Sequence, residues 1–235
     1  MTAANPVFVS IDTTDVDTAR TLAQGLAGLV GGVKLGLEFF VAQGPAGVRA
    51  VLGGDSDVPF FLDLKLHDIP NTVAGGVRAA LPLNPAFMTI HTSGGPAMMR
   101  AAADAAAAGG AKRPRILGVT VLTSLDDGDL EAVGQSTPVA GQVERLARLA
   151  KDCGLDGGVC SPTEVAALRA ACGPDFILMV PGIRPAWSAV NDQKRIMTPA
   201  QAMAAGASHL VIGRPITADP VPADAARRIN AELGL

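Results

Sequence analysis

The chain has 235 residues, 49% of them hydrophobic, which is enough for one large domain with an ample buried core. A formal net charge of -3 and an isoelectric point near 5.6 exclude the broad basic surface that nucleic acid requires. No apolar run reaches the ~18 residues of a membrane span, and the opening MTAANPVFVS lacks the features of a secretory signal. We therefore expect a cytoplasmic protein that binds neither nucleic acid nor membrane.

Short apolar, β-branched runs recur along the chain and predict eight strands. Stretches rich in alanine, leucine and arginine lie between them and are typical of helices, as in residues 15–29 and 96–110. No composition break or linker interrupts this alternation, so we expect one domain over residues 1–235. The predicted strands cover residues 6–12, 31–36, 58–65, 86–91, 115–123, 155–160, 175–182 and 208–213.

Strands that alternate with helices predict a parallel sheet covered by helices. Eight strands close a β/α barrel, whereas an open doubly wound sheet normally has fewer. The predicted fold class is therefore α/β, a single (β/α)8 barrel of the TIM type. An open sheet is the alternative that the sequence leaves.

Polar residues stand at the ends of many predicted strands. In β/α barrels the carboxyl ends of the strands and the loops after them form the active-site face. Side chains from different strands therefore meet at one mouth, and their convergence predicts an active site better than any single residue does. The residues are Asp12, Lys34, Asp63, Lys65, Thr123, Ser124, Arg184 and Arg214.

The stretch FFLDLKLHDIPNTV, residues 60–73, places charges inside an apolar run. Asp63 and Lys65 are two positions apart and so project from the same face of a strand. A purely structural ion pair is the alternative, but buried pairs often fail to recover their desolvation cost. An unpaired ammonium at Lys34 in a core strand would also be unfavourable. We therefore expect these charges to serve chemistry.

The histidines and cysteines show no spacing typical of metal ligands, and no C-x-x-C motif occurs. Three thiols, an odd number, indicate buried or incidental cysteines in a reducing compartment. We expect structural roles for His67, His91, His209, Cys153, Cys160 and Cys172.

The seventh and eighth loops predict a phosphate site. Loops seven and eight of such barrels frequently bind phosphate through backbone N–H groups and a cation. Arg184 follows the seventh strand, and Gly213–Arg214 follows the eighth. The polar stretch 182–196, with Gln193 and the single tryptophan Trp187, predicts a lid over the phosphate. An irregular surface loop is the alternative.

These motifs together resemble the orotidine 5′-phosphate decarboxylase family, which catalyses the last step of uridine monophosphate synthesis. The D-x-K-x-x-D pattern is typical of a superfamily, and DLKLHDIPNT narrows it to the decarboxylase. The likeness covers nearly the whole chain in order, through VSID, VKLG, FFLDLKLHDIPNTV, HTSGG, VTVLTS, VPGIRP, NDQKRI and VIGRPIT.

The resemblance implies a carboxy-lyase that works without cofactor or metal and converts orotidine 5′-monophosphate into uridine 5′-monophosphate and CO₂. It implies that Lys65 donates a proton to C6 of the pyrimidine. Lys34, Asp63, Lys65 and Asp68 would form an alternating charge array, with Asp68 supplied by the second subunit of a homodimer.

The resemblance also implies how the rest of the substrate is held. Asp12 and Lys34 would hydrogen-bond the ribose, and Thr123 rather than Ser124 would face the pyrimidine. The wall shared between subunits would include Ile69 and Thr72. The 5′-phosphate would be bound by Arg184, Gln193, Gly213 and Arg214.

Three alternatives remain from the sequence. A sister barrel with the same motif could be a Mg²⁺-dependent sugar-phosphate decarboxylase or synthase, although HDIPNT and Gln193 argue against it. An aldolase could use Lys65 as a Schiff base. A non-catalytic nucleotide-sensing barrel would gain little from a costly cluster of buried charges.

Overall fold

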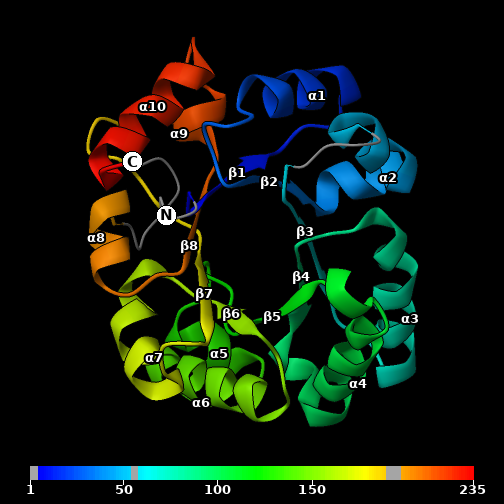
Figure 1. Cartoon of the computed structure of the whole chain (residues 1–235). Coiled ribbons are helices and arrows are strands. Elements are labelled where there is room, and N and C mark those ends of the chain that lie inside the picture. The colour runs from blue at the N-terminus through cyan, green and yellow to red at the C-terminus, as the bar shows by residue number, and fades with distance from the viewer. Residues whose placement is uncertain (1–4, 54–57, 189–196) are drawn as a thin grey trace.

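Eight parallel strands form a closed barrel at the centre of the molecule, and helices surround it (Figure 1). The computed structural model describes residues 5–53, 58–188 and 197–235. Each strand pairs with the next in chain order, and β8 pairs with β1 to close the ring. The strands are β1 (Val7–Ile11), β2 (Gly32–Gly36), β3 (Phe60–Leu66), β4 (Phe87–His91), β5 (Arg115–Val119), β6 (Gly157–Val159), β7 (Ile177–Val180) and β8 (His209–Ile212).

The prediction of a (β/α)8 barrel is confirmed, and every predicted strand overlaps an observed one. Short 3-10 turns cover Leu81–Leu83, Thr92–Gly94, Gly110–Lys112 and Pro162–Glu164. The helices are α1 (Val16–Gly25), α2 (Leu37–Leu52), α3 (Pro70–Ala80), α4 (Gly95–Ala107), α5 (Asp127–Ala132), α6 (Val139–Asp152), α7 (Val165–Cys172), α8 (Pro199–Ala204), α9 (Arg214–Thr217) and α10 (Pro222–Leu233).

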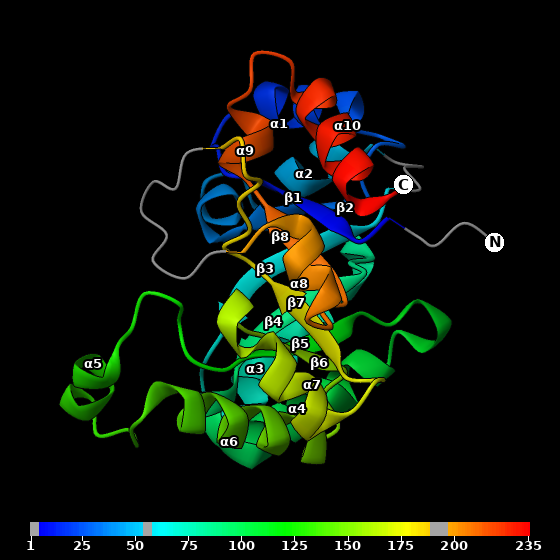
Figure 2. The same ribbon diagram turned by 90° about the vertical axis from the view of Figure 1, so that its left-hand side faces the viewer.

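Local sequence explains where several helices begin and bend. Asp15 caps α1, because its carboxylate accepts a hydrogen bond from the Thr18 N–H at 2.7 Å. Helix α2 bends at Gly44, whose φ of 58° suits a residue without a Cβ, and Pro45 follows it. Helices α5 and α9 lie on the side towards which the strands run (Figure 2).

Apolar side chains fill the barrel interior. Phe8 meets Phe61 and Phe87 edge to face, with ring centroids 6.5 Å and 5.3 Å apart. Leu117 on β5 and Met179 on β7 belong to the same inner cluster. A second, larger set of apolar residues packs the outer face of the strands against the helices. Because the interior is solid, polar chemistry is confined to the ends of the barrel.

Candidate active site

The first three strands bring charged side chains together at their carboxyl ends. The register aligns Ser10 with Lys34 on β1 and β2, and Gly36 with Asp63 on β2 and β3. Asp12 follows β1 directly, and the Ser10 hydroxyl lies 2.9 Å from both oxygens of its carboxylate. Parallel pairing thus delivers aspartate, lysine and aspartate to one mouth, where the sequence placed them.

Four side chains form a continuous array of alternating charge. Lys34 Nζ lies 3.5 Å from Asp12 Oδ1 and 3.5 Å from Asp63 Oδ2. Lys65 Nζ donates to the same Asp63 oxygen at 2.7 Å. The side chains of Lys34 and Asp63 are only 10% and 12% exposed, whereas that of Lys65 is 37% exposed. The array therefore runs from a buried centre to an ammonium group that reaches the open mouth.

The Asp63 carboxylate is held in its ionised form. Burial by itself would raise the pKa of Asp63, but Lys34 and Lys65 outweigh it by charge attraction, and the pKa lies below its usual value. Hydrogen bonds from Lys65 and Thr89 add to the lowering. Asp63 therefore remains an anion at neutral pH despite its burial.

Thr89 on β4 is a site residue that sequence reasoning did not single out. It is fully buried, and its hydroxyl accepts from the Lys65 N–H at 2.9 Å and donates to Asp63 Oδ1 at 2.9 Å. Lys65 has a φ of 52°, in the left-handed region that non-glycine residues rarely adopt. The pairing of β3 with β4 shifts register between Leu62 and Leu66, on either side of Lys65. The Thr89 hydroxyl thus gives the Lys65 N–H a hydrogen-bond acceptor where the pairing of β3 with β4 is irregular.

Two glycines lie close to the array at this mouth. A Cβ added to Gly36 would lie 3.1 Å from Lys34 Nζ, so the glycine makes space for the ammonium group. A Cβ on Gly213 would lie 3.4 Å from Ser10 Cβ and 3.7 Å from Asp12 Oδ2. The turn after β8 therefore lies directly against the acid that follows β1.

The predicted phosphate-binding arginines lie in neighbouring loops. Arg184 follows β7 and is 7% exposed, and its Nη1 donates to the Ile183 carbonyl at 3.0 Å. Arg214 begins α9 immediately after β8, at an exposed position. Gln193 lies outside the described residues. The structure therefore places two of the three predicted phosphate-binding side chains in the segments that follow the adjacent strands β7 and β8.

Asp68, Ile69 and Thr72 lie at the exposed start of α3, and the ion pairs of the array do not include Asp68. Asp68 Oδ1 accepts from the Ile69 N–H at 2.6 Å, and the Thr72 N–H donates to the Ile69 carbonyl at 3.1 Å. Ile69 is 66% exposed, an unusual environment for an isoleucine beside a charged mouth. This segment is therefore exposed in the single chain and lies outside the ion pairs of the array.

The predicted end of the fifth strand is wrong. β5 ends at Val119 rather than Thr123, because its neighbour β6 ends at Val159, which pairs with Val119. Beyond that point the Thr120 hydroxyl donates to the Val159 carbonyl at 3.1 Å, and the chain leaves the barrel. Thr123 and Ser124 line a cavity of about 560 Å³ beside α5 and the start of α6. That Thr123 faces a pyrimidine stays a prediction.

The chain matches the model of the family described as "Orotidine 5'-phosphate decarboxylase / HUMPS family" over residues 5–229. The chain belongs to this family. An orotidine 5′-phosphate decarboxylase from Paramagnetospirillum magneticum is 60% identical over 235 residues, covering 98% of this chain and 99% of that protein. One from Rhodospirillum rubrum is 56% identical, covering 97% of this chain and 94% of that protein.

Solved structures give the same result for the fold. The crystal structure of orotidine 5′-phosphate decarboxylase from Lactobacillus acidophilus matches with a TM-score of 0.86 and 37% identity. The match covers 98% of this chain and all of that chain (100%). The family resemblance expected from DLKLHDIPNT and its companion motifs is confirmed.

The histidines and cysteines of this decarboxylase-family chain take no part in the ion pairs of the array. Burial lowers the pKa of His91, and His67, whose ring centroid is 5.2 Å away, lowers it further. His209 lies at the amino end of β8 and packs edge-on against Phe8 and Phe87. The three cysteines are buried, and burial raises the pKa of Cys160 and Cys172, so these two thiols are unreactive.

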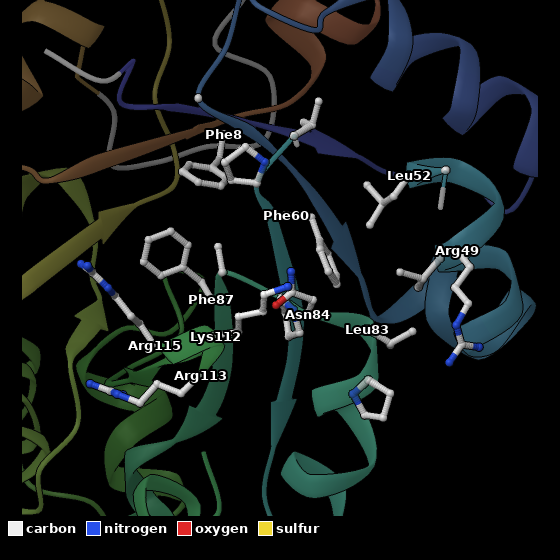
Figure 3. Close-up of a pocket in the computed structure, with 18 of the residues that line it drawn as sticks. Phe8, Arg49, Leu52, Phe60, Leu83, Asn84, Phe87, Lys112, Arg113 and Arg115 are labelled. Carbon is white, nitrogen blue, oxygen red and sulfur yellow. The ribbon is translucent and has the colours of Figure 1, made fainter. Parts of the chain in front are cut away.

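A further cavity lies at the opposite end of the barrel from the array. It has a volume of about 840 Å³ and is lined by residues such as Phe8, Phe60 and Asn84. Figure 3 shows Lys112 beside Asn84, while the side chains of Arg49 and Arg113 extend to opposite sides. Its cations do not converge on one point, so we assign the chemistry to the carboxyl end.

Among the residues that the structure describes, no three His, Cys, Asp or Glu side chains are placed to hold a metal ion. No helix there is long and apolar enough to cross a membrane.

Proposed function

We propose that this chain decarboxylates orotidine 5′-monophosphate to uridine 5′-monophosphate and CO₂, the last step of de novo pyrimidine synthesis. The observation that carries the proposal is the Asp12–Lys34–Asp63–Lys65 array at the barrel mouth. Relatives that bear the decarboxylase name are 60% and 50% identical over nearly the whole chain. We further propose a cytoplasmic location and a single catalytic domain over residues 1–235.

The direct test follows the ultraviolet absorbance of orotidine 5′-monophosphate, which is lost as the carboxylate leaves. We expect the purified chain to remove this absorbance and to release one CO₂ per uridine 5′-monophosphate formed. A folded chain that leaves the compound intact, yet acts on a sugar phosphate when Mg²⁺ is added, would belong to the other branch of its family.

The substrate would lie across the mouth with its phosphate on the loops after β7 and β8. Arg184, Arg214 and Gln193 would bind the phosphate oxygens, and Gly213 would let the chain approach closely. Asp12 lies against Gly213, so a ribose attached to that phosphate would meet Asp12 and Lys34 next. The pyrimidine would then lie over Lys65, with Thr123 predicted at its far edge.

The reaction requires charge stabilisation and one proton. The bond between C6 and the carboxylate carbon breaks, CO₂ leaves, and the electron pair remains on C6. The Lys65 ammonium would stabilise that pair and then transfer a proton to C6, leaving a neutral amine that solvent reprotonates. Its 2.7 Å contact with Asp63 supports this role, because it would hold the ammonium group where the electron pair develops.

Electrostatics supplies part of the acceleration. A unit-charge contact at about 4 Å with an effective dielectric near 20 is worth ~4 kcal/mol, or about three decades of rate. Asp63 would lie near the substrate carboxylate, where repulsion is relieved as CO₂ leaves. Binding of the remote phosphate would supply further stabilisation by excluding water from the site.

We also propose that the active enzyme is a homodimer in which Asp68 of each chain completes the mouth of the other. Asp68 lies outside the array of its own chain, beside the exposed Ile69. Two other exposed apolar residues, Leu37 at 58% and Leu122 at 39%, also follow strand ends at this mouth. Exposed apolar groups around a charged rim are typical of an interface.

Subunit mixing tests this proposal. Lys65→Ala and Asp68→Ala chains, each inactive alone, are mixed and allowed to exchange. In a two-fold dimer one site of the heterodimer carries both defects and the other carries neither, so recovery should approach about a quarter of wild-type activity. If mass spectrometry confirms that the subunits exchange but no activity is recovered, Asp68 acts in its own barrel.

A further inference from the structure

The single tryptophan of the chain is held against the C-terminal helix. The Arg228 guanidinium on α10 lies 4.0 Å from the centroid of the Trp187 ring, a cation–π contact. The same guanidinium forms a salt bridge through Nη2 with Asp219, which lies between α9 and α10. Trp187 is 42% exposed, so the contact lies at the surface and not in the core.

Helix α10 contacts both sides of the segment that follows β7. On one side Arg228 holds Trp187, three residues after Arg184. On the other side Glu232, one turn further along α10, accepts a hydrogen bond from the Ala200 N–H at the start of α8, at 3.1 Å. The Arg184 N–H also donates to the Met197 carbonyl at 3.0 Å, which joins the two sides of the segment.

Through its salt bridge with Asp219, Arg228 is also connected to the loop after β8. Asp219 follows α9, which begins with Arg214, and the Asp219 N–H donates to the Ile216 carbonyl at 3.2 Å. Figures 1 and 2 both show α8, α9 and α10 together on one side of the barrel. A single guanidinium, that of Arg228, therefore connects the segment carrying Arg184 with the turn behind Arg214.

We infer that Trp187, Arg228 and Asp219 are positioning residues, which hold Arg184 and Arg214 at the spacing that a phosphate dianion requires. The inference rests on the proposed function, because it assigns these residues to the phosphate end of the same site. None of the three touches the reacting carbon. Their loss should therefore weaken use of the phosphate and leave the chemistry of the pyrimidine unchanged.

The kinetic test compares two neighbouring arginines of α10. Arg228→Ala removes the contact, whereas Arg227→Ala removes only an exposed pair with Asp224 at 2.6 Å and is the matched control. For Arg228→Ala we expect kcat/KM for orotidine 5′-monophosphate to fall about tenfold, mainly through KM. Orotidine lacks the phosphate, and added phosphite should accelerate its turnover less in Arg228→Ala than in the wild type. Turnover of orotidine without phosphite should be unchanged.

Intrinsic fluorescence gives an independent measurement. The chain has one tryptophan and no tyrosine. Fluorescence excited at about 295 nm, which selects tryptophan, therefore comes from Trp187 alone. Uridine 5′-monophosphate should change the emission of the wild type and of Arg227→Ala, and uridine should not. In Arg228→Ala the emission of the free protein should differ, and the response to the nucleotide should weaken.

Further variants guard against misfolding. Arg228→Lys keeps the charge but loses the planar group that stacks on the ring, so it should restore activity only in part. If Arg228→Ala fails to fold, Trp187→Leu removes the same contact from the other side and should raise KM in the way expected for Arg228→Ala. If Arg228→Ala and Trp187→Leu match Arg227→Ala in KM and phosphite activation, the inference is wrong while the decarboxylase assignment stands. A wild type without activity on orotidine 5′-monophosphate would instead overturn the assignment itself.

Discussion

Replacement of Thr89 by valine tests whether one buried hydroxyl sets the geometry of the catalytic array. Valine has nearly the same shape but removes the bonds to the Lys65 N–H and to Asp63 Oδ1, both 2.9 Å. A neutral hydrogen bond contributes ~1 kcal/mol and one to a charged group ~1.5–3 kcal/mol, so the free energy of unfolding should fall by about 2–4 kcal/mol. Thermal or urea unfolding measures this change.

The same substitution should affect kcat more than KM. Without the hydroxyl, the left-handed backbone of Lys65 loses its anchor, and displacement of a catalytic group by about 1 Å can reduce the rate ~100-fold. We expect kcat to fall about 10- to 100-fold, with KM changed less than about threefold because Arg184 and Arg214 are untouched. Initial rates at limiting and saturating orotidine 5′-monophosphate separate the two constants.

The pH dependence of stability gives a further test, because the direction of its shift in Thr89→Val follows from the pKa of Asp63. Asp63 has a lowered pKa in the folded chain, so its contribution to stability is present above the unfolded-state pKa and is lost as pH falls through the folded-state pKa. Loss of the Thr89 donor raises that folded-state pKa. Acid unfolding of Thr89→Val should therefore begin at a higher pH than that of the wild type.

Two variants make the interpretation specific. Thr92 is also fully buried and donates to the Val119 carbonyl at 2.9 Å, so Thr92→Val removes a buried hydrogen bond outside the array. Thr89→Ser keeps the hydroxyl and should restore most of kcat. If Thr89→Val lowers stability as Thr92→Val does but retains kcat within about twofold, Thr89 has only a structural role and the reasoning fails.

Three further predictions test the site as a whole. EDTA should leave activity unchanged, since the array charges neutralise one another; inhibition reversed by Mg²⁺ would contradict this. Lys65→Ala should abolish turnover yet still bind uridine 5′-monophosphate, and a rate within about tenfold of wild type would remove Lys65 from its role. Arg214→Ala should mainly raise KM, with a smaller fall in kcat, and phosphite should partly rescue turnover of orotidine by the wild type. Absence of any phosphite effect would show that phosphate binding does not drive catalysis.

The barrel and its charged mouth could be predicted from sequence because both follow from short-range patterns. Eight β-branched runs with helical stretches between them determine the strand count, and strand-end charges fall at one mouth in any such barrel. The end of β5 could not be predicted in the same way. The run VTVLT continues with high strand propensity, but β6 is short and offers no partner beyond Val159.

Thr89 and the Trp187 contact were missed for a related reason. A threonine in the strand FMTIH is ordinary for its propensity, and its partner Asp63 is 26 residues away in the chain. Only the tertiary register, with its shift near Lys65, gives that hydroxyl two partners. Trp187 likewise meets Arg228 through the packing of α10, which no local motif encodes.

The charge balance of the array favours Lys65 over Lys34 for the proposed proton transfer. Within the described residues the charges of two aspartates and two lysines sum to zero, but the two lysines do not have equal numbers of carboxylate partners. Lys34 lies between two carboxylates and is 8% exposed, so its charge is countered on both sides. Lys65 has one carboxylate partner and an open side.

If Asp68 of a second subunit joins the array, the site gains one negative charge before substrate binds. The substrate carboxylate then adds another beside Asp63, which favours departure of CO₂ and leaves a carbanion in its place. In the proposed binding mode Lys65, with its less countered charge, would be the cation nearest to that carbanion. Proton transfer from Lys65 neutralises both the amine and C6, whereas transfer from Lys34 would leave Asp12 and Asp63 without their shared cation. The same argument predicts that Asp68→Asn impairs the chemical step more than the binding of uridine 5′-monophosphate, which lacks the carboxylate.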